Sequence, residues 1–302
     1  MKGIEAAAAL ALTMALAGAT VPQTPLQAPL QTPLQRPLQT PLQAPLFNKQ
    51  RVTYKNGALT LVGFSYHPNG AGPFPTVVWN HGSEKNPGTS PQFDSVAAIF
   101  VPAGYAVFAP MRRGHGNSEG TYIVDSVAKI RETDKDGALK LTVHLLETEQ
   151  LEDQFAGINY VKTLSFVDTA HMVVTGCSYG GIQTLLAAER GGGFKAAMPI
   201  SPAAQSWEGN ALLRARMETA VRKINMPVLL IQPPKDASLR PAKELGDAAK
   251  KFHKTNFTAK IYAATMPDSQ QTHCFGGAKG FRNFATEAIT FFNGALGRKS
   301  AQ

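Results

Sequence analysis

Short apolar runs alternate with helix-forming stretches along most of this chain of 302 residues. The runs typical of buried strands are residues 76–79, 105–109, 171–174, 194–200, 228–231 and 258–263. The stretches with helical character are residues 93–101, 146–164, 210–223, 240–252 and 280–295. Apolar strands that alternate with helices are typical of a parallel sheet covered by helices on both faces. The pattern therefore predicts the α/β fold class.

Two further strands are predicted at the start of the folded region. Residues 51–54 and 59–64 favour strands, and Asn56-Gly57 lies between them. An Asn-Gly pair between two strands indicates a tight hairpin turn. We therefore expect a mostly parallel sheet of about eight strands with an antiparallel hairpin at its N-terminal edge. In such sheets ligands bind at the carboxyl ends of the strands, so candidate functional residues are sought in the loops that follow them.

The N-terminal residues differ in composition from the rest of the chain. Residues 1–19 carry the positive charge of Lys2 near their start, continue with an apolar run over residues 6–17 and end in Ala-Gly-Ala, as in a secretory signal peptide cleaved before Thr20. An alanine-rich N-terminal helix is the alternative. The apolar run is shorter than the roughly 20 residues that span a bilayer. We therefore expect an exported protein, periplasmic or secreted, without stable membrane insertion.

Residues 20–46 carry a repeat in which proline recurs at every fourth position, followed by Leu-Gln. Proline at this spacing is incompatible with a helix and removes donors that a sheet needs. The segment is expected to be an extended tether that precedes one folded domain at residues 47–302. The tether is interpreted either as a spacer that associates the protein with the envelope or cell wall, or as a duplication product with no role.

The net charge of +9 arises from basic residues scattered along the chain. Nucleic-acid binding requires basic residues gathered with aromatic ones, and the sequence has no such cluster, so we expect no nucleic-acid partner. Cys177 and Cys274 are the only cysteines, and neither lies in a His/Cys pattern typical of zinc sites. We expect no metal and no cofactor.

Residues 176–181 read Gly-Cys-Ser-Tyr-Gly-Gly and lie between an apolar strand and a helical stretch. Strand, sharp turn and helix is the setting in which the pattern G-x-S-x-G holds a nucleophilic serine out at the end of a sheet. Side chains two residues either side of the serine would collide with the neighbouring strand and helix, which explains the glycines. Ser178 is therefore the candidate nucleophile, and a simple Gly-Ser turn is the alternative. Cys177 does not fit the pattern, because Thr175 and Tyr179 stand where its glycines would be.

A serine nucleophile needs a base that takes its proton and an acid that orients the base. At such a turn the order along the chain is serine, acid, histidine. Asp236 follows the strand at residues 228–231, and His273 lies in the loop after the next strand, so they are the candidate acid and base. Asp268 is a rival acid in the same loop as His273, and His253 lies in a basic helical stretch that is expected to be exposed.

The negative charge that develops on a carbonyl oxygen during acyl transfer requires hydrogen-bond donors that are already in place. One candidate is the backbone N–H of Tyr179, next to Ser178. The second is the backbone N–H of Ser83, in a loop where the preceding Gly82 permits a close approach. His81, in the same loop, is expected to hold the loop rather than to take part in chemistry.

Residues 110–120 form a glycine-rich loop that follows a predicted strand. The loop lacks the lysine and the helix-opening pattern of a phosphate-binding loop. Arg113 or His115 would line a pocket if the loop were functional, but a tight structural crossover is the favoured interpretation. Residues 121–148 are longer than a plain crossover needs, and their apolar positions predict either a small helical cover near the pocket or surface packing.

Together these motifs resemble the α/β-hydrolase superfamily. The resemblance is carried by Asn80-His81-Gly82, the loop at residues 112–120, the Gly-Cys-Ser-Tyr-Gly-Gly stretch and the order of Ser178, Asp236 and His273. Within the superfamily the chain resembles the dienelactone-hydrolase-like group and the catalytic domains of prolyl-oligopeptidase-type serine hydrolases. Dienelactone hydrolases carry cysteine where this chain has Ser178, so their lactone chemistry is not implied.

The residues and the resemblance predict an exported serine esterase that cleaves a small-molecule carboxylic ester through an acyl-enzyme. A serine peptidase of the prolyl-oligopeptidase type is the alternative enzyme, although such enzymes usually carry a large β-propeller, which the tether cannot replace. A non-catalytic binding protein is a third interpretation, disfavoured because Ser178, Asp236 and His273 are all present. A disulfide between Cys177 and Cys274 would suit an exported protein, but small hydrophobic packing of the two side chains is favoured.

Overall fold

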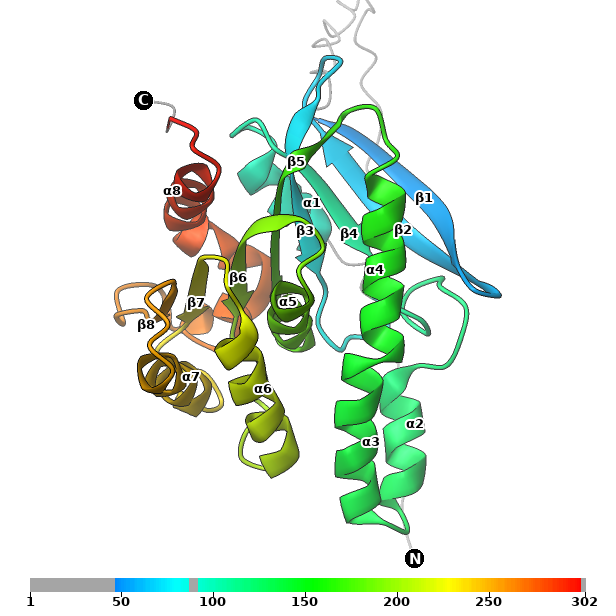
Figure 1. Ribbon diagram of the computed structural model, residues 1–302, viewed down its shortest axis with the longest axis vertical. Coiled ribbons are helices and arrows are strands. Elements are labelled where there is room, and N and C mark those ends of the chain that lie inside the picture. Colours follow the sequence, from blue (N-terminus) through cyan, green and yellow to red (C-terminus); the bar gives the residue numbers. More distant parts are fainter. Residues whose placement is uncertain (1–46, 87–91, 300–302) are drawn as a thin grey trace, which may run out of the picture. The chain divides into compact units, whose positions relative to one another are not determined.

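The structure is a computed structural model that describes residues 47–86 and 92–299 (Figure 1). The predicted signal peptide at residues 1–19 and the predicted tether at residues 20–46 lie outside the described residues. Within the described ranges, no helix is both long enough and apolar enough to cross a membrane.

Eight strands of the described chain form one sheet in the spatial order β1-β2-β4-β3-β5-β6-β7-β8. Their bounds are β1 Asn48–Asn56, β2 Leu59–His67, β3 Phe74–Asn80, β4 Ala106–Pro110, β5 Val167–Cys177, β6 Phe194–Ile200, β7 Val228–Gln232 and β8 Phe257–Ile261. β2 pairs antiparallel with both β1 and β4, whereas every neighbouring pair from β4 to β8 is parallel. The predicted parallel sheet with an antiparallel N-terminal hairpin is confirmed.

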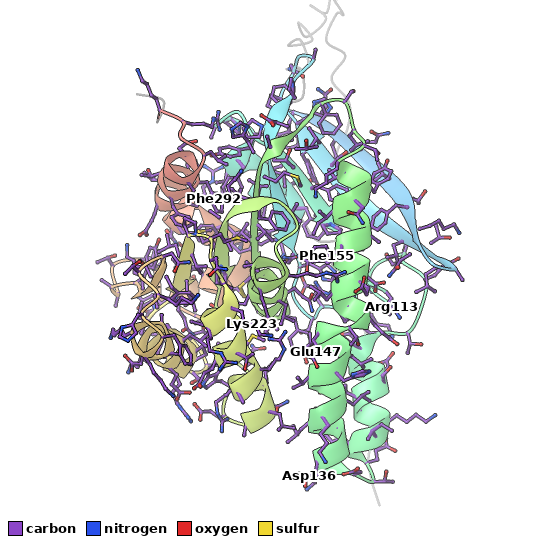
Figure 2. All side chains as sticks on the ribbon, in the orientation of Figure 1. Arg113, Asp136, Glu147, Phe155, Lys223 and Phe292 are labelled. Atoms are coloured by element: carbon purple, nitrogen blue, oxygen red, sulfur yellow. A yellow bond between two sulfur atoms is a disulfide. The ribbon has the colours of Figure 1, made fainter. Side chains whose placement is uncertain are left out.

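Helices cover both faces of this sheet. Their bounds are α1 Gln92–Phe100, α2 Ile123–Arg131, α3 Lys135–Glu147, α4 Glu149–Val161, α5 Tyr179–Arg190, α6 Ala211–Lys223, α7 Arg240–Lys251 and α8 Ala285–Ala295. Val78 of β3 packs into one apolar cluster with α4 to α7, and its neighbours Val77 and Trp79 pack into a second cluster with α1 and α8. Phe155 and Phe292, labelled in Figure 2, belong to the first and the second cluster respectively. Because both faces are occupied, the loops at the strand ends are where a site can form.

The helix predicted at residues 146–164 corresponds to α4, and the residues before Thr148 belong to α3. Thr148 separates α3 from α4 with φ −112° and ψ −96°, and its hydroxyl donates to the His144 carbonyl at 2.6 Å. This local hydrogen bond competes with the helical pattern and ends α3 there. α2 and α3 lie side by side and extend beyond the sheet in Figure 1, in the region where the sequence predicted a helical cover.

Candidate active site

Ser178 lies between the end of β5 and the start of α5, at the carboxyl edge of the sheet. Its φ of 61° and ψ of −120° form a conformation that residues with a side chain rarely adopt. The Ser178 N–H donates to the Ile200 carbonyl at 3.1 Å, and the Ser178 carbonyl accepts from the Ile182 N–H at 3.1 Å. Strained backbone that neighbouring contacts hold in place is concentrated at functional sites. The local geometry is that of a nucleophile elbow.

Two glycines allow the elbow to approach the end of β3. A Cβ atom at Gly176 would lie 2.4 Å from the Asn80 carbonyl oxygen, and a Cβ atom at Gly180 would lie 2.0 Å from the same oxygen. Both distances are far shorter than a van der Waals contact, so a larger residue does not fit at either position. Because the loop at residues 81–83 begins directly after Asn80, this approach brings the loop beside Ser178.

His273 and Asp236 form a hydrogen-bonded pair at the same edge of the sheet. Nδ1 of His273 lies 2.7 Å from Oδ1 of Asp236, whose side chain is fully buried. Two further donors hold this carboxylate, the Gln232 side-chain amide at 3.0 Å and the Ala237 backbone N–H at 2.8 Å. A fixed carboxylate at Nδ1 favours the tautomer in which Nδ1 carries the proton and Nε2 can accept one.

The rival acid Asp268 points elsewhere. Its side chain is 83% exposed, forms an ion pair with Lys235 at 2.8 Å and accepts from the Gln271 amide at 3.0 Å. His253 follows α7 and is exposed, as expected. The structure therefore places Asp236, and not Asp268, against His273.

A cavity of about 320 Å³ opens at this edge, and its lining includes Ser83, Glu84, Ser178 and His273. Nε2 of His273 is buried and has no hydrogen-bond partner among the described residues. Buried polar atoms are nearly always partnered, so an unpartnered nitrogen in a cavity indicates that a ligand or a moving group supplies the partner. Catalytic hydrogen bonds are often long before substrate binds. Ser178 and Nε2 of His273 are thus presented to the same space.

Cys177 and Cys274 form a disulfide, so the favoured prediction of simple hydrophobic packing was wrong. Their Cα atoms lie 5.9 Å apart although the two residues are separated by 97 positions in the sequence. Residues far apart in the sequence lie close together here because parallel strands have their carboxyl ends at the same edge of the sheet. The bond joins the residue before Ser178 to the residue after His273, and it therefore ties the nucleophile turn to the histidine loop.

The two predicted oxyanion donors lie beside the elbow. Tyr179 is the first residue of α5, so its N–H has no acceptor within the helix and lies at the positive end of the helix dipole. Ser83 lines the cavity together with Ser178. The Ser83 carbonyl accepts a hydrogen bond from the Tyr122 hydroxyl, which fixes this loop against the segment that leads into α2.

Arg112, to which the sequence motifs assign no individual role, holds the loop that contains Ser83. It is only 1% exposed, and its guanidinium donates to the His81 carbonyl at 3.0 Å and to the Gly82 carbonyl at 2.6 Å. In a trans peptide the C=O and the following N–H point in opposite directions. By holding the Gly82 carbonyl on the buried side of the loop, Arg112 turns the Ser83 N–H to the other side. The sequence signal was an Arg-Arg pair, which does not show which arginine is buried.

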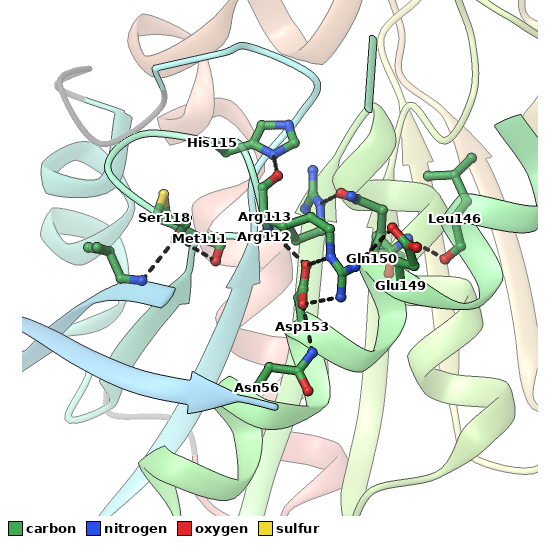
Figure 3. A network of polar contacts seen from close by, with 12 residues as sticks. Asn56, Met111, Arg112, Arg113, His115, Ser118, Leu146, Glu149, Gln150 and Asp153 are labelled. Atoms are coloured by element: carbon green, nitrogen blue, oxygen red, sulfur yellow. Dashed lines mark hydrogen bonds and ion pairs between the residues drawn. The ribbon is translucent and has the colours of Figure 1, made fainter. Parts of the chain in front are cut away.

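Helix α4 holds both arginines of this loop, as Figure 3 shows. Nε of Arg112 donates to the Gln150 side chain at 3.1 Å, and Arg113 forms an ion pair with the buried Asp153 at 2.8 Å. Burial lowers the pKa of Arg112 to about 10, so its guanidinium is still charged at neutral pH. Arg113 does not line the cavity that contains Ser178. It anchors the loop to α4, in agreement with the favoured structural interpretation.

Two buried histidines pack behind the same loop. The rings of His81 and His115 have centroids 4.5 Å apart, and Nε2 of His81 accepts from the Arg112 backbone N–H at 3.2 Å. Burial, reinforced by the charge of Arg112, drives the pKa of His81 well below its ordinary value, and burial lowers the pKa of His115 to about 3. Both are therefore neutral at physiological pH. Neither lines the cavity with Ser178, so their contacts hold the loop.

The chain is similar to known hydrolases in part of its sequence and in its fold. Residues 141–210 match the prolyl oligopeptidase family, and no curated protein matches the chain significantly. An esterase from Pyrococcus furiosus has 16% identity and a TM-score of 0.61, over 83% of this chain and 94% of that chain. The acylaminoacyl peptidase of Pyrococcus horikoshii has 15% identity and a TM-score of 0.62, over 85% of this chain and 43% of that chain. A predicted dienelactone hydrolase from Klebsiella pneumoniae has 15% identity and a TM-score of 0.58, over 82% of this chain and 98% of that chain.

The chain therefore has the α/β-hydrolase fold. The segment that matches the prolyl oligopeptidase family contains β5, the elbow and α5. The chain spans less than half the length of the acylaminoacyl peptidase and nearly the whole length of the esterase. At identities this low the similarity establishes the fold, whereas the chemistry depends on the residues of the site.

Proposed function

We propose that this protein is a serine hydrolase that cleaves carboxylic esters through an acyl-enzyme intermediate. The observation that carries the proposal is the Asp236–His273 pair, whose second ring nitrogen is unpartnered in the cavity that also contains Ser178. Ser178 lies on a strained turn, close to the two candidate backbone donors at Tyr179 and Ser83. A serine, a base and an orienting acid in this relation are what nucleophilic acyl transfer requires.

In this mechanism Ser178 Oγ attacks the carbonyl carbon of the ester while Nε2 of His273 takes the hydroxyl proton. Asp236 orients the ring and stabilises the imidazolium that forms. The N–H groups of Tyr179 and Ser83 donate to the oxygen that becomes negatively charged. His273 then gives its proton to the leaving alcohol, and a water molecule activated by the same nitrogen releases the acyl group.

The fold similarity to the Pyrococcus furiosus esterase supports an ester substrate, because it extends over 83% of this chain and 94% of that chain. The similarity to the acylaminoacyl peptidase extends over 85% of this chain and 43% of that chain.

A serine peptidase is the second candidate, and Glu84 is the observation that favours it. Glu84 lines the cavity together with Ser178 and His273, and a carboxylate there would pair with the amino group of a peptide substrate. The match of residues 141–210 to the prolyl oligopeptidase family supports the same candidate. For a peptidase, Glu84→Gln would reduce the cleavage of aminoacyl-anilides by at least about tenfold more than the cleavage of neutral esters.

We also propose that the protein is exported, as the N-terminal sequence predicts. The Cys177–Cys274 disulfide supports export, because structural disulfides persist mainly in oxidising compartments. Cell fractionation with N-terminal sequencing tests this proposal. A periplasmic or secreted chain that begins at Thr20 is expected, and an uncleaved chain confined to the cytoplasm would contradict it.

The substrate test is a panel of p-nitrophenyl esters of graded acyl length beside aminoacyl-p-nitroanilides. The wild type is compared with Ser178→Ala and with Ser126→Ala, a serine of α2 that does not line the cavity. We expect ester turnover by the wild type and by Ser126→Ala, and loss of at least about three orders of magnitude in Ser178→Ala. Equal turnover by wild type and Ser178→Ala would refute the proposed nucleophile. Anilide cleavage without ester cleavage would favour the peptidase.

A further inference from the structure

A second cavity of about 470 Å³ adjoins the one that contains Ser178. Gln205 lines both cavities, and Tyr179, which follows Ser178 in the sequence, lines the second. The remaining walls come from the α2–α3 hairpin, through residues from Arg131 to Thr142, and from the turn that precedes α6. A substrate bound at Ser178 therefore has an adjacent space in which a second group can lie.

The charged residues that line this second cavity are both basic. Arg131 ends α2 and Lys135 begins α3, and both are exposed. Among the residues that the structure describes, neither side chain has an ion-pair or hydrogen-bond partner. The two cations therefore keep their hydrogen-bonding capacity for a ligand.

Nearby carboxylates do not lie in this cavity. Asp134 precedes α3 and caps it by accepting from the Gly137 N–H at 2.8 Å. Glu208 accepts from the Ser238 hydroxyl at 2.7 Å and is paired with Arg240, away from the lining. Among the described residues, no aspartate or glutamate lines the cavity, although Glu132 and Asp136 follow Arg131 and Lys135 directly in the sequence.

The Tyr179 hydroxyl adds a neutral donor. It has no hydrogen-bond partner among the described residues, and burial raises its pKa, so the hydroxyl keeps its proton. Arg131 is close enough to act on it electrostatically. Thr142 donates to the Ala138 carbonyl at 2.8 Å, Ser206 donates to the Ala203 carbonyl at 3.4 Å, and Asn210 accepts from the Leu213 N–H at 3.0 Å. The Gln205 amide, which also lines the cavity, has no hydrogen-bond partner among the described residues.

We propose that this second cavity binds a carboxylate carried by the substrate, so that the protein acts on esters with a second, negatively charged group. The inference rests on the proposed function. Arg131, Lys135 and the Tyr179 hydroxyl are all donors, and a carboxylate is an acceptor that satisfies all three. A purely apolar acyl chain would leave these donors without partners and gain nothing from the charges.

The test compares kcat/KM for p-nitrophenyl hydrogen glutarate with kcat/KM for p-nitrophenyl valerate, the neutral ester with the same number of carbon atoms. We expect the wild type to prefer the glutarate, and the double variant Arg131→Gln/Lys135→Gln to lose at least about tenfold of that preference. The matched control is Lys129→Gln, because Lys129 carries the same charge on α2 but does not line the cavity. Its preference should stay within about twofold of the wild type.

An unchanged glutarate preference in the double variant would overturn the inference. So would a wild type that cleaves both esters equally well, and in that case the proposed ester hydrolysis would still stand. Arg131→Lys, which keeps the charge, is expected to retain more of the preference than Arg131→Gln. High salt should reduce the preference, because it screens the attraction between exposed charges.

A binding measurement separates this inference from the failure of the proposed function. Glutarate itself is titrated by calorimetry into the Ser178→Ala protein, which needs no turnover, with and without the Arg131→Gln/Lys135→Gln pair. Glutarate binding to the Ser178→Ala protein that is lost when Arg131→Gln and Lys135→Gln are added supports the carboxylate site even if no ester is hydrolysed. Absence of glutarate binding to the Ser178→Ala protein would overturn it.

Discussion

Cys177 and Cys274 join the two halves of the candidate catalytic machinery by a covalent bond. Cys177 is the last residue of β5 and directly precedes Ser178, whereas Cys274 directly follows His273. Cys274 has φ 54° and lies in a turn of left-handed conformation that continues through Gly277. A residue with a side chain is disfavoured there, so the bond helps to hold the histidine loop in an unfavourable conformation.

The first prediction concerns this disulfide. Cys177→Ala/Cys274→Ala is expected to lower kcat, because the histidine loop is no longer fixed to the elbow, and to lower the free energy of unfolding by about 2–5 kcal/mol. Denaturant unfolding and ester turnover measure the two effects. Dithiothreitol should slow the wild type and leave the double variant unaffected. A wild type that keeps full activity after complete reduction, verified by thiol titration, would contradict the role given to the bond.

The second prediction concerns Arg112 as a positioning residue. Arg112→Met is expected to lower kcat by about tenfold to a hundredfold with little change in KM, because the Ser83 N–H loses its fixed direction. Arg113→Met is the control, since Arg113 is paired with Asp153 and touches neither loop carbonyl. It should lower the melting temperature without a comparable fall in kcat. If both variants lose stability alike and neither changes kcat per folded molecule, Arg112 has only a structural role.

The third prediction concerns the approach of the elbow to β3. Gly180→Ala is expected to destabilise the protein by several kcal/mol and to abolish activity, because its Cβ would lie 2.0 Å from the Asn80 carbonyl oxygen. Gly294→Ala is the control, since a Cβ at this α8 position meets no atom within 4 Å. It should be neutral or stabilising by up to about 1 kcal/mol. Wild-type stability and activity in Gly180→Ala would show that the elbow is not packed as described.

The fourth prediction concerns stability at acid pH. Burial lowers the pKa of His115 to about 3, whereas an unfolded chain has a histidine pKa near about 6.5. The unfolded state therefore binds more protons between these two pH values, so the free energy of unfolding falls as the pH falls below about 6.5. Protonation of His115 in the unfolded chain alone should lower the free energy of unfolding by about 2 kcal/mol at about pH 5 relative to neutral pH.

Urea unfolding at a series of pH values measures this slope. His115→Asn removes one of two buried histidines with a lowered pKa and should reduce the slope, whereas His81 maintains part of it. His253→Asn is the control, because His253 is exposed. It should leave the slope unchanged. A slope in His115→Asn identical to that of the wild type would contradict the neutral buried state of His115.

The parallel sheet and the elbow could be predicted because each depends on local sequence. The apolar runs that became β3, β5 and β7 are short and continuous, and the glycines around Ser178 mark a turn that few other sequences can form. The pairing of Asp236 with His273 followed from chain order and from the convergence of strand ends. Each of these features is determined by one short segment of sequence or by the rule that parallel strands end at the same edge of the sheet.

The remaining features depend on contacts between distant segments. The direction of the Arg112 guanidinium is set by the loop carbonyls that it meets and by Gln150 of α4. The Cys177–Cys274 bond depends on how closely the histidine loop returns to β5, which sequence spacing does not give. The break at Thr148 arises from one side-chain hydrogen bond within an otherwise helical stretch.

The most direct test of the central claim is the site of covalent labelling by a fluorophosphonate, which reacts with activated serines. Peptide mapping by mass spectrometry locates the adduct after treatment of the wild type, Ser178→Ala, His273→Ala and Ser126→Ala. We expect one adduct per chain at Ser178 in the wild type and in Ser126→Ala, none in Ser178→Ala, and labelling slowed by orders of magnitude in His273→Ala. An adduct on another residue, or labelling of Ser178→Ala at the wild-type rate, would contradict it.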